Sequence, residues 1–284
     1  MFKNLSPGAV GIKATTQQAI HLAATCGFQG VDLNINEAAE SVDKGELDRY
    51  RAAFRSRGIV PGGWGLPVDF RRDDATFERD LAGLARLAQA ADAMDCRRAF
   101  TYLLPFSDTL TYKENFALHR QRFVRITAVL VRHNIRLGLE FVGPKPVRDG
   151  HRYEFIYRMD QMLELCDAVG TGNLGLLLDC YHWHTSGGTL DEIRRLRPEQ
   201  VVYVHVNDAA PDLPPDELPD SPRRLPGETG VIDLVGFLGA LKTINYDGPV
   251  TPEPFDASLG TLPPEKAARK VADAMNRTWA AAGL

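Results

Sequence analysis

The sequence has few cysteines, and the four that it has lie far apart: Cys26, Cys96, Cys166 and Cys180. None are spaced as C-x-x-C, which excludes a finger-type zinc site and argues against a disulfide framework. No run of about 18 apolar residues occurs in the chain, so a transmembrane helix is excluded. The segment Met1–Lys13 also lacks the apolar stretch of a signal peptide. We therefore expect a cytoplasmic protein with no membrane partner.

An excess of basic charge is also missing. The chain has 33 basic and 37 acidic residues, and its net charge is −4. Proteins that bind duplex nucleic acid normally carry a basic surface, so we expect no nucleic-acid partner. No G-x-G-x-x-G or phosphate-binding loop follows an expected strand, which argues against a doubly wound nucleotide-binding sheet. The content of 44% hydrophobic and 25% charged residues is typical of a globular protein.

Short apolar segments alternate with longer amphipathic ones eight times along the chain. The expected strands are Ala9–Lys13, Gly30–Asn34, Ile59–Gly63, Arg98–Leu103, Arg136–Val142, Asn173–Asp179, Val201–Asn207 and Pro249–Pro254. The expected helices are Thr16–Cys26, Lys44–Arg57, Asp74–Met94, Glu114–His133, Asp160–Val169, Leu190–Leu196, Ile232–Thr243 and Glu265–Ala281. Such alternation predicts a parallel sheet whose two faces are covered by helices.

Eight units of about 35 residues fit a closed barrel better than an open sheet. We predict an α/β protein that forms a single (β/α)8 TIM barrel over residues 1–284. The connections at about 143–158 and 208–230 are longer than the others, and each follows a strand. Loops that follow strands lie at the carboxyl-terminal mouth of a barrel, where barrel enzymes hold their active sites. We therefore expect both to be active-site loops, with variable solvent-exposed loops as the alternative.

Charged or imidazole side chains stand at the ends of the last four expected strands: Glu140, Asp179, His205 and Glu253. Each one alone is typical of a helix cap, an ion pair or a structural histidine, but four in succession indicate a shared site. Three carboxylates in a desolvated space would force one of them to protonate, so a cation is expected among them. Asp208 is expected to orient His205, as metal-bound histidines usually require.

The expected ligand set is rich in oxygen. It favours Mn²⁺, with Mg²⁺, Co²⁺ or Zn²⁺ as alternatives. Three carboxylates and one divalent ion leave about one negative charge. Arg223 or Arg224 on the loop that follows is expected to balance this charge, the alternative being two solvated arginines.

Two further residues are candidates for contact with a substrate. His182 lies three positions beyond Asp179 and is expected to bind a substrate hydroxyl or to transfer a proton. A packed structural histidine is the alternative. Trp64 follows the third expected strand and is a candidate apolar wall against a sugar face, and core packing is an equal alternative.

Several of these segments, taken in order, carry a resemblance to a known family. They are Gly138-Leu139-Glu140, Leu178-Asp179-Cys180-Tyr181-His182, Val204-His205-Val206-Asn207-Asp208, Arg224-Leu225-Pro226-Gly227-Glu228, Tyr246-Asp247-Gly248-Pro249 and Glu253-Pro254-Phe255. The chain resembles the xylose-isomerase-like TIM-barrel superfamily of sugar isomerases and epimerases. That superfamily includes ketose 3-epimerases, hydroxypyruvate isomerase, inosose dehydratase and endonuclease IV. The resemblance covers essentially the whole chain.

The resemblance implies roles for residues of this chain. The four strand-end residues would be the metal ligands, and Glu140 and Glu253 would also be the catalytic acid/base pair. His182 and Arg224 would touch substrate oxygens. Epimerases of this group follow the first ligand with an Asn-Arg-Tyr-Glu-like stretch. Here Glu140 is followed by Phe141-Val142-Gly143-Pro144 instead, which leaves the substrate and the reaction open.

The leading hypothesis is a divalent-metal-dependent isomerase or epimerase that acts on a keto sugar or related polyol. The reaction would transfer a proton next to a carbonyl through an enediolate. The same residues would suit a metal-dependent lyase, either an inosose-type dehydratase or an enzyme that eliminates from a keto-glycoside. A non-catalytic sugar- or metal-binding barrel is a third alternative. The expected partner is a small-molecule sugar substrate, and a homo-oligomer is compatible with the sequence.

A DNA-repair enzyme similar to endonuclease IV is a remote alternative. That family needs a trinuclear metal cluster with extra histidines from the early strands. No histidine occurs between His21 and His119, and the chain is acidic overall.

Overall fold

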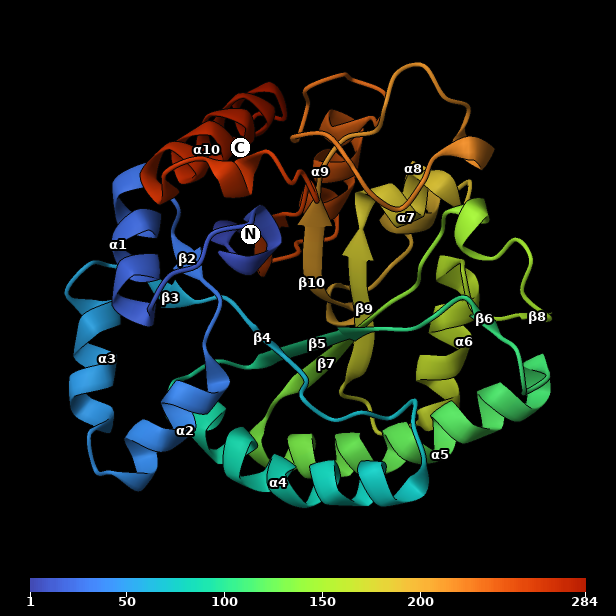
Figure 1. Cartoon of the computed structure of the whole chain (residues 1–284), viewed down its shortest axis with the longest axis horizontal. Coiled ribbons are helices and arrows are strands. Elements are labelled where there is room, and N and C mark those ends of the chain that lie inside the picture. Colours follow the sequence, from blue (N-terminus) through green and yellow to red (C-terminus); the bar gives the residue numbers. More distant parts are fainter.

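Nine short strands form one parallel sheet that curls into a barrel, and helices form a ring around it (Figure 1). The computed structural model describes residues 1–284. The strand order is β3-β2-β1-β11-β10-β9-β7-β5-β4. The strands are β1 (Phe2–Leu5), β2 (Gly30–Val31), β3 (Val60–Pro61), β4 (Trp64–Gly65), β5 (Arg98–Tyr102), β7 (Arg136–Glu140), β9 (Leu174–Asp179), β10 (Val201–Val206) and β11 (Pro249–Pro252).

The strands β3 and β4 are two halves of one barrel stave. β3 pairs with β2, and β4 pairs with β5. Between them, the backbone N–H of Gly62 donates to the carbonyl of Val31 at 2.9 Å. Beyond β4, the N–H of Leu66 donates to the carbonyl of Phe100 at 2.8 Å. This one segment therefore bonds to neighbours on both sides and closes the sheet, which confirms the predicted eight-stave barrel.

The helices follow the strands as the alternation predicts. They are α1 (Thr16–Cys26), α2 (Ile35–Asp43), α3 (Leu47–Arg55), α4 (Asp74–Ala93), α5 (Tyr112–Leu130), α6 (Met159–Val169), α7 (Cys180–Thr185), α8 (Leu190–Arg194), α9 (Leu234–Thr243) and α10 (Pro264–Ala281). The hydroxyls of Thr15, Thr111 and Thr189 each accept from the third helical N–H, which satisfies a donor that the helix itself leaves unpaired. No helix combines the length and apolarity that a bilayer span needs.

Two of the expected elements are wrong. The first strand is β1 and not Ala9–Lys13, and Gly8–Val10 is a short 3-10 helix. The polar residues Lys3 and Asn4 hide β1 from a search for apolar runs. The helix expected over Lys44–Arg57 is two helices, α2 and α3. They are separated near Gly45, whose φ of +69° lies in the left-handed region.

Both long connections reach the barrel mouth, the end at which the strands finish. The 143–158 connection contains the short 3-10 helix η3 (Lys145–Val147) and the strand β8 (Tyr153–Glu154). β8 pairs antiparallel with β6 (Phe106–Ser107), which belongs to the loop after β5. The other connection contains η5 (Pro215–Glu217), which contacts η3. The two loops therefore meet on the same side of the barrel.

Candidate metal centre

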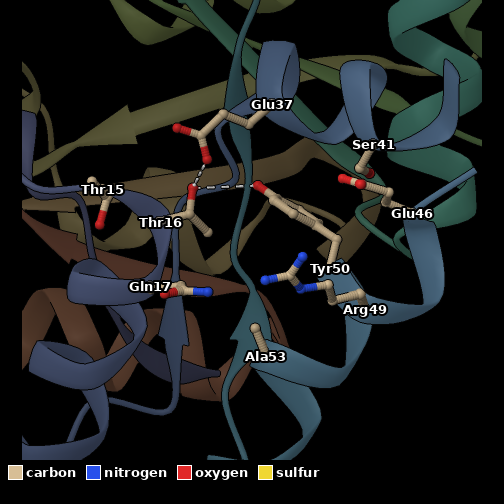
Figure 2. A pocket seen from close by; sticks show the side chains of 9 residues that line it. All are labelled: Thr15, Thr16, Gln17, Glu37, Ser41, Glu46, Arg49, Tyr50 and Ala53. Carbon is tan, nitrogen blue, oxygen red and sulfur yellow. Dashed lines mark hydrogen bonds between the residues drawn. The ribbon is translucent and has the colours of Figure 1, made fainter. Parts of the chain in front are cut away.

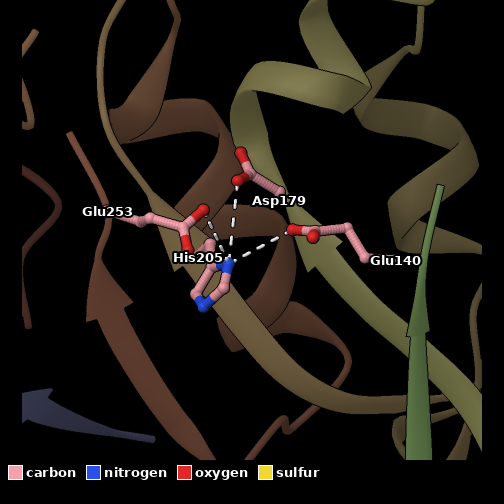
Figure 3. Close-up of side chains that lie close together, drawn as sticks. All are labelled: Glu140, Asp179, His205 and Glu253. Carbon is pink, nitrogen blue, oxygen red and sulfur yellow. Dashed lines mark hydrogen bonds and ion pairs between the residues drawn. The ribbon is translucent and has the colours of Figure 1, made fainter. Parts of the chain in front are cut away.

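The four residues predicted as metal ligands lie together at the barrel mouth (Figure 3). They come from four consecutive staves, β7, β9, β10 and β11. One ligand atom from each side chain lies within 4.8 Å of the others. Nδ1 of His205 is 3.2 Å from a carboxylate oxygen of Glu140 and 3.2 Å from one of Glu253. The same Nδ1 is 3.7 Å from Oδ2 of Asp179.

Burial makes this cluster electrostatically unusual. It raises the pKa of Glu140 to about 8, although the hydrogen bond with His205 opposes the shift. Burial acts to lower the pKa of His205, but Glu253 and Glu140 outweigh it and raise that pKa well above its usual range. Burial also acts to raise the pKa of Asp179, and here Arg223 outweighs it and holds that pKa below its usual range. The donor set fits a divalent cation, because three carboxylates and one imidazole converge with too little positive charge around them.

Arg223, and not Arg224, lies at the cluster. Its Nη1 donates to Oδ2 of Asp179 at 2.8 Å and to Oε2 of Glu253 at 3.2 Å. Only 1% of the Arg223 side chain is exposed. The next side chain along, Arg224, is exposed, and its backbone bridges to Asp208. Neighbours in an extended segment point in opposite directions, so one of the two arginines had to face away.

His182 lies where the sequence predicts, at the edge of the cluster. Its Nε2 is 3.1 Å from Nη2 of Arg223, and its Nδ1 is 3.3 Å from the backbone nitrogen of Gly143. Burial lowers the pKa of His182 to about 4, against the attraction of Asp179, so the imidazole is neutral. A neutral imidazole has one acceptor nitrogen, so the ring can accept from Arg223 or from Gly143 but not from both.

Trp64 lies outside the site, contrary to its predicted role as an apolar wall. The side chain is completely buried and presents no surface to the mouth. The reason is the alternation of side chains along a strand. A Cβ at Gly63 would lie 2.7 Å from the ring of Tyr203 inside the barrel, so Trp64 points to the other face. Two aromatic residues that sequence reasoning missed, Tyr102 and Phe255, are exposed near the strand ends instead.

The predicted contact between Asp208 and His205 is also absent. The carboxylate of Asp208 accepts hydrogen bonds from four backbone N–H groups, those of Ala209, Thr229, Gly230 and Ile232. It therefore ties together the two ends of the 208–230 connection that carries Arg223. No hydrogen-bond partner from the protein holds the other ring nitrogen of His205.

A separate pocket of about 330 Å³ lies between α1, α2 and α3 (Figure 2). Thr16 and Tyr50 meet there, and their hydroxyl oxygens are 3.4 Å apart. The lining contains two glutamates but no histidine or cysteine, and it includes none of the four clustered residues. This pocket is therefore separate from the cluster at the barrel mouth.

Comparison with known proteins agrees with this geometry. Residues 20–278 match the family described as the xylose isomerase-like TIM barrel. The chain belongs to this family. An inosose isomerase from Bacillus velezensis is a relative that is 30% identical over 241 residues, which are 84% of this chain and 83% of that protein. The chain is accordingly an enzyme of the sugar isomerase and epimerase type.

Solved structures superpose over nearly the whole chain. A xylose isomerase domain protein from Alicyclobacillus acidocaldarius has a TM-score of 0.86 and 30% identity, and the match covers 99% of both chains. The IOLI protein, solved with a bound zinc atom, has a TM-score of 0.80 and covers 98% of both chains. Its identity of 19% shows the likeness of fold alone.

Metal binding at the cluster should tighten as the pH rises. In the metal-free protein, Glu140 with its pKa of about 8 and His205 with its raised pKa both hold a proton at pH 7. Each must lose that proton to act as a ligand, and each proton displaced contributes about tenfold per pH unit. The association constant for Mn²⁺ should therefore rise by up to about 100-fold per pH unit between pH 6 and 8. Calorimetry in buffers of different ionisation enthalpy measures the protons released, and an association constant independent of pH would contradict the expectation.

Proposed function

We propose that the protein is a divalent-metal-dependent isomerase of a cyclic keto polyol of the inosose type. The observation that carries the proposal is the placement of two glutamates around one histidine. Glu140 and Glu253 approach His205 from opposite sides, and Asp179 lies between them (Figure 3). Each glutamate directs one oxygen to His205, and its second oxygen takes part in no hydrogen bond. One side chain can therefore remove a proton from one face of a bound carbon while the other serves the opposite face.

Glu140, Asp179, His205 and Glu253 would hold the metal ion, with Mn²⁺ as the first choice. When bound, such an ion acts as a Lewis acid that polarises a carbonyl oxygen and orients the adjacent hydroxyl. The residues of this chain then perform the proton transfer. Glu140 holds a proton at pH 7 in the metal-free protein because burial raises its pKa, and it would give up this proton when the ion binds, which leaves the carboxylate available as the general base.

The surrounding residues would orient the substrate and exclude water. Arg223 stays charged, because Asp179 and Glu253 raise its pKa further in spite of its burial. Arg223 lies beside the neutral imidazole of His182, and both side chains would contact substrate oxygen atoms next to the cluster. Asp220 holds the guanidinium of Arg223 from the loop side at 2.8 Å. The two long loops would cover the mouth and reduce access of water to the carbon that loses its proton.

The deciding experiment follows products by NMR in deuterated water. Mn²⁺-loaded protein should convert an inosose into its positional isomer, with deuterium at the carbon next to the carbonyl. A dehydrated or cleaved product in place of the isomer would show a lyase instead. Metal binding with no turnover of any inosose or keto sugar would show a non-catalytic barrel. Protein treated with a chelator is the control and should be inactive.

A further inference from the structure

A second polar cluster lies inside the barrel, next to the predicted metal ligands. It consists of Asn4 on β1, Asp32 just beyond β2, Tyr203 on β10 and Thr251 on β11. Oδ1 of Asp32 accepts from the Tyr203 hydroxyl at 2.7 Å and from Nδ2 of Asn4 at 2.8 Å. The Thr251 hydroxyl donates to the oxygen of Tyr203, also at 2.7 Å. Asp32 is therefore held directly from two other strands, β1 and β10, and Thr251 on β11 holds Tyr203 in turn.

Glycines on the neighbouring staves leave the room that this cluster needs. A Cβ at Gly62 would collide with the amide of Asn4, and a Cβ at Gly30 would lie 2.7 Å from Oδ1 of Asn4. Asp32 follows Gly30 by two positions and so faces the same way, into the barrel. The close fit fixes the direction in which Asp32 points.

The sheet register places Asp32 in the same layer as Glu253. Lys3 pairs with Val250, and three positions further along these strands this register brings Ser6 level with Glu253. On its other side, β1 pairs Leu5 with Val31, so Ser6 is also level with Asp32. Asp32 therefore approaches the mouth at the depth of Glu253, from the first staves of the barrel, which carry none of the four predicted ligands.

One oxygen of Asp32 is left without a partner. Oδ2 is buried and has no protein partner at hydrogen-bond geometry, with the Ser6 hydroxyl as a neighbouring side chain. Asp32 also lines a cavity of about 410 Å³ formed by the segments that follow β1 and β2, with Ser6 and Asn34 among its other residues. A buried carboxylate oxygen without a donor is unfavourable, so this rigidly held acceptor, on a residue that lines a cavity, is suited to a ligand hydroxyl.

We propose that Asp32 binds a hydroxyl group of the substrate, on the part of the polyol ring away from the metal ligands. The inference rests on the proposed function and adds a specificity residue to it. Asp32 takes no part in the proton transfer. It selects substrates that carry a hydroxyl at this position over analogues that lack it, because without the hydroxyl its Oδ2 would stay unpaired.

The test compares Asp32→Asn and Asp32→Ala with Asp43→Asn, a matched control at the exposed end of α2. With an inosose as substrate, both Asp32 variants should raise KM by about 10- to 100-fold, the loss expected for one hydrogen bond to a charged group. The kcat value should stay within about threefold, and the Asp43→Asn variant should match the wild type in both constants. A wild-type KM retained in both Asp32 variants would overturn the proposal.

A series of inososes that each lack one ring hydroxyl supplies a second readout. One member of the series lacks the hydroxyl that Asp32 is proposed to bind. For that member, the wild type and Asp32→Asn should have the same KM, raised above the wild-type value for the complete inosose, because the same hydrogen bond is missing in both. If Asp32→Asn instead raised KM over the wild type by the same factor for every member of the series, Asp32 would have a merely structural role and the proposal would be overturned. If the wild type turns over no inosose, the proposed function fails, and calorimetric titration of the Mn²⁺-loaded proteins with inosose decides the role of Asp32. Binding that is 10- to 100-fold weaker in Asp32→Asn supports the role, whereas equal affinities or no binding overturn it.

Discussion

Replacing either glutamate of the proposed acid/base pair should abolish most of the isomerase activity. Glu140→Gln and Glu253→Gln remove the group that accepts or returns the proton but keep the side-chain volume and one oxygen that can face the metal. General acid–base groups contribute about 10²- to 10⁴-fold, so kcat should fall by that factor in each variant. Deuterium exchange at the carbon next to the carbonyl, followed by NMR, reports the loss directly.

The fold should survive both replacements. Burial already raises the pKa of Glu140 to about 8, so the neutral amide resembles the form that the metal-free protein holds at pH 7. Glu154→Gln, an exposed position on β8, is the control and should keep wild-type kcat. Full activity in either site variant, with circular dichroism unchanged, would remove that glutamate from the mechanism.

The second large effect is expected at Arg223. Its guanidinium is buried against Asp179 and Glu253, and no other arginine or lysine pairs with either carboxylate. Removing one partner of a buried ion pair leaves an uncompensated charge, which typically destabilises by about 3–5 kcal/mol. Arg223→Ala should therefore lower the free energy of unfolding of the metal-free protein by about that amount in urea denaturation. Activity should fall with it, because the same guanidinium faces the proposed substrate position.

Arg224→Ala is the matched control for this experiment. The two arginines are adjacent in the chain, but Arg224 is exposed and has no carboxylate partner within 4 Å. Exposed substitutions of this kind usually change stability by less than about 0.5 kcal/mol. Saturating Mn²⁺ should restore part of the stability of Arg223→Ala, because the divalent charge replaces the lost cation. Equal stability in the two variants would show that Arg223 does not compensate the cluster.

The barrel and its four clustered residues could be predicted from the order of residues. Strand–helix alternation repeats eight times, and a residue at the end of an apolar strand must lie at the mouth whatever the details of packing. Glu140 and Asp179 end their strands, so their meeting follows from topology. The same reasoning located His182, because its distance from Asp179 in the chain is too short to take it far away.

The order of residues does not predict which of two adjacent side chains faces the site and which faces away from it. Arg223 and Arg224 are chemically identical, and only the path of the 208–230 connection decides which one faces the carboxylates. From the sequence, the Trp64 side chain could face either the mouth or the helices. Its direction is fixed because the adjacent Gly63 faces the Tyr203 ring inside the barrel.

The polar contacts inside the barrel could not be predicted from the sequence either. Asn4 and Asp32 belong to no recognisable sequence motif, and the polar Asn4 interrupts the apolar pattern by which β1 would have been predicted. Both residues nevertheless form hydrogen bonds with Tyr203, which is far away in the sequence. Local periodicity determines which elements form and where each strand ends, because it depends on residues a few positions apart. Which polar side chains meet depends on closure of the sheet, which brings Tyr203 to Asp32 and Asn4, 171 and 199 positions away in the chain. Only the folded barrel decides that.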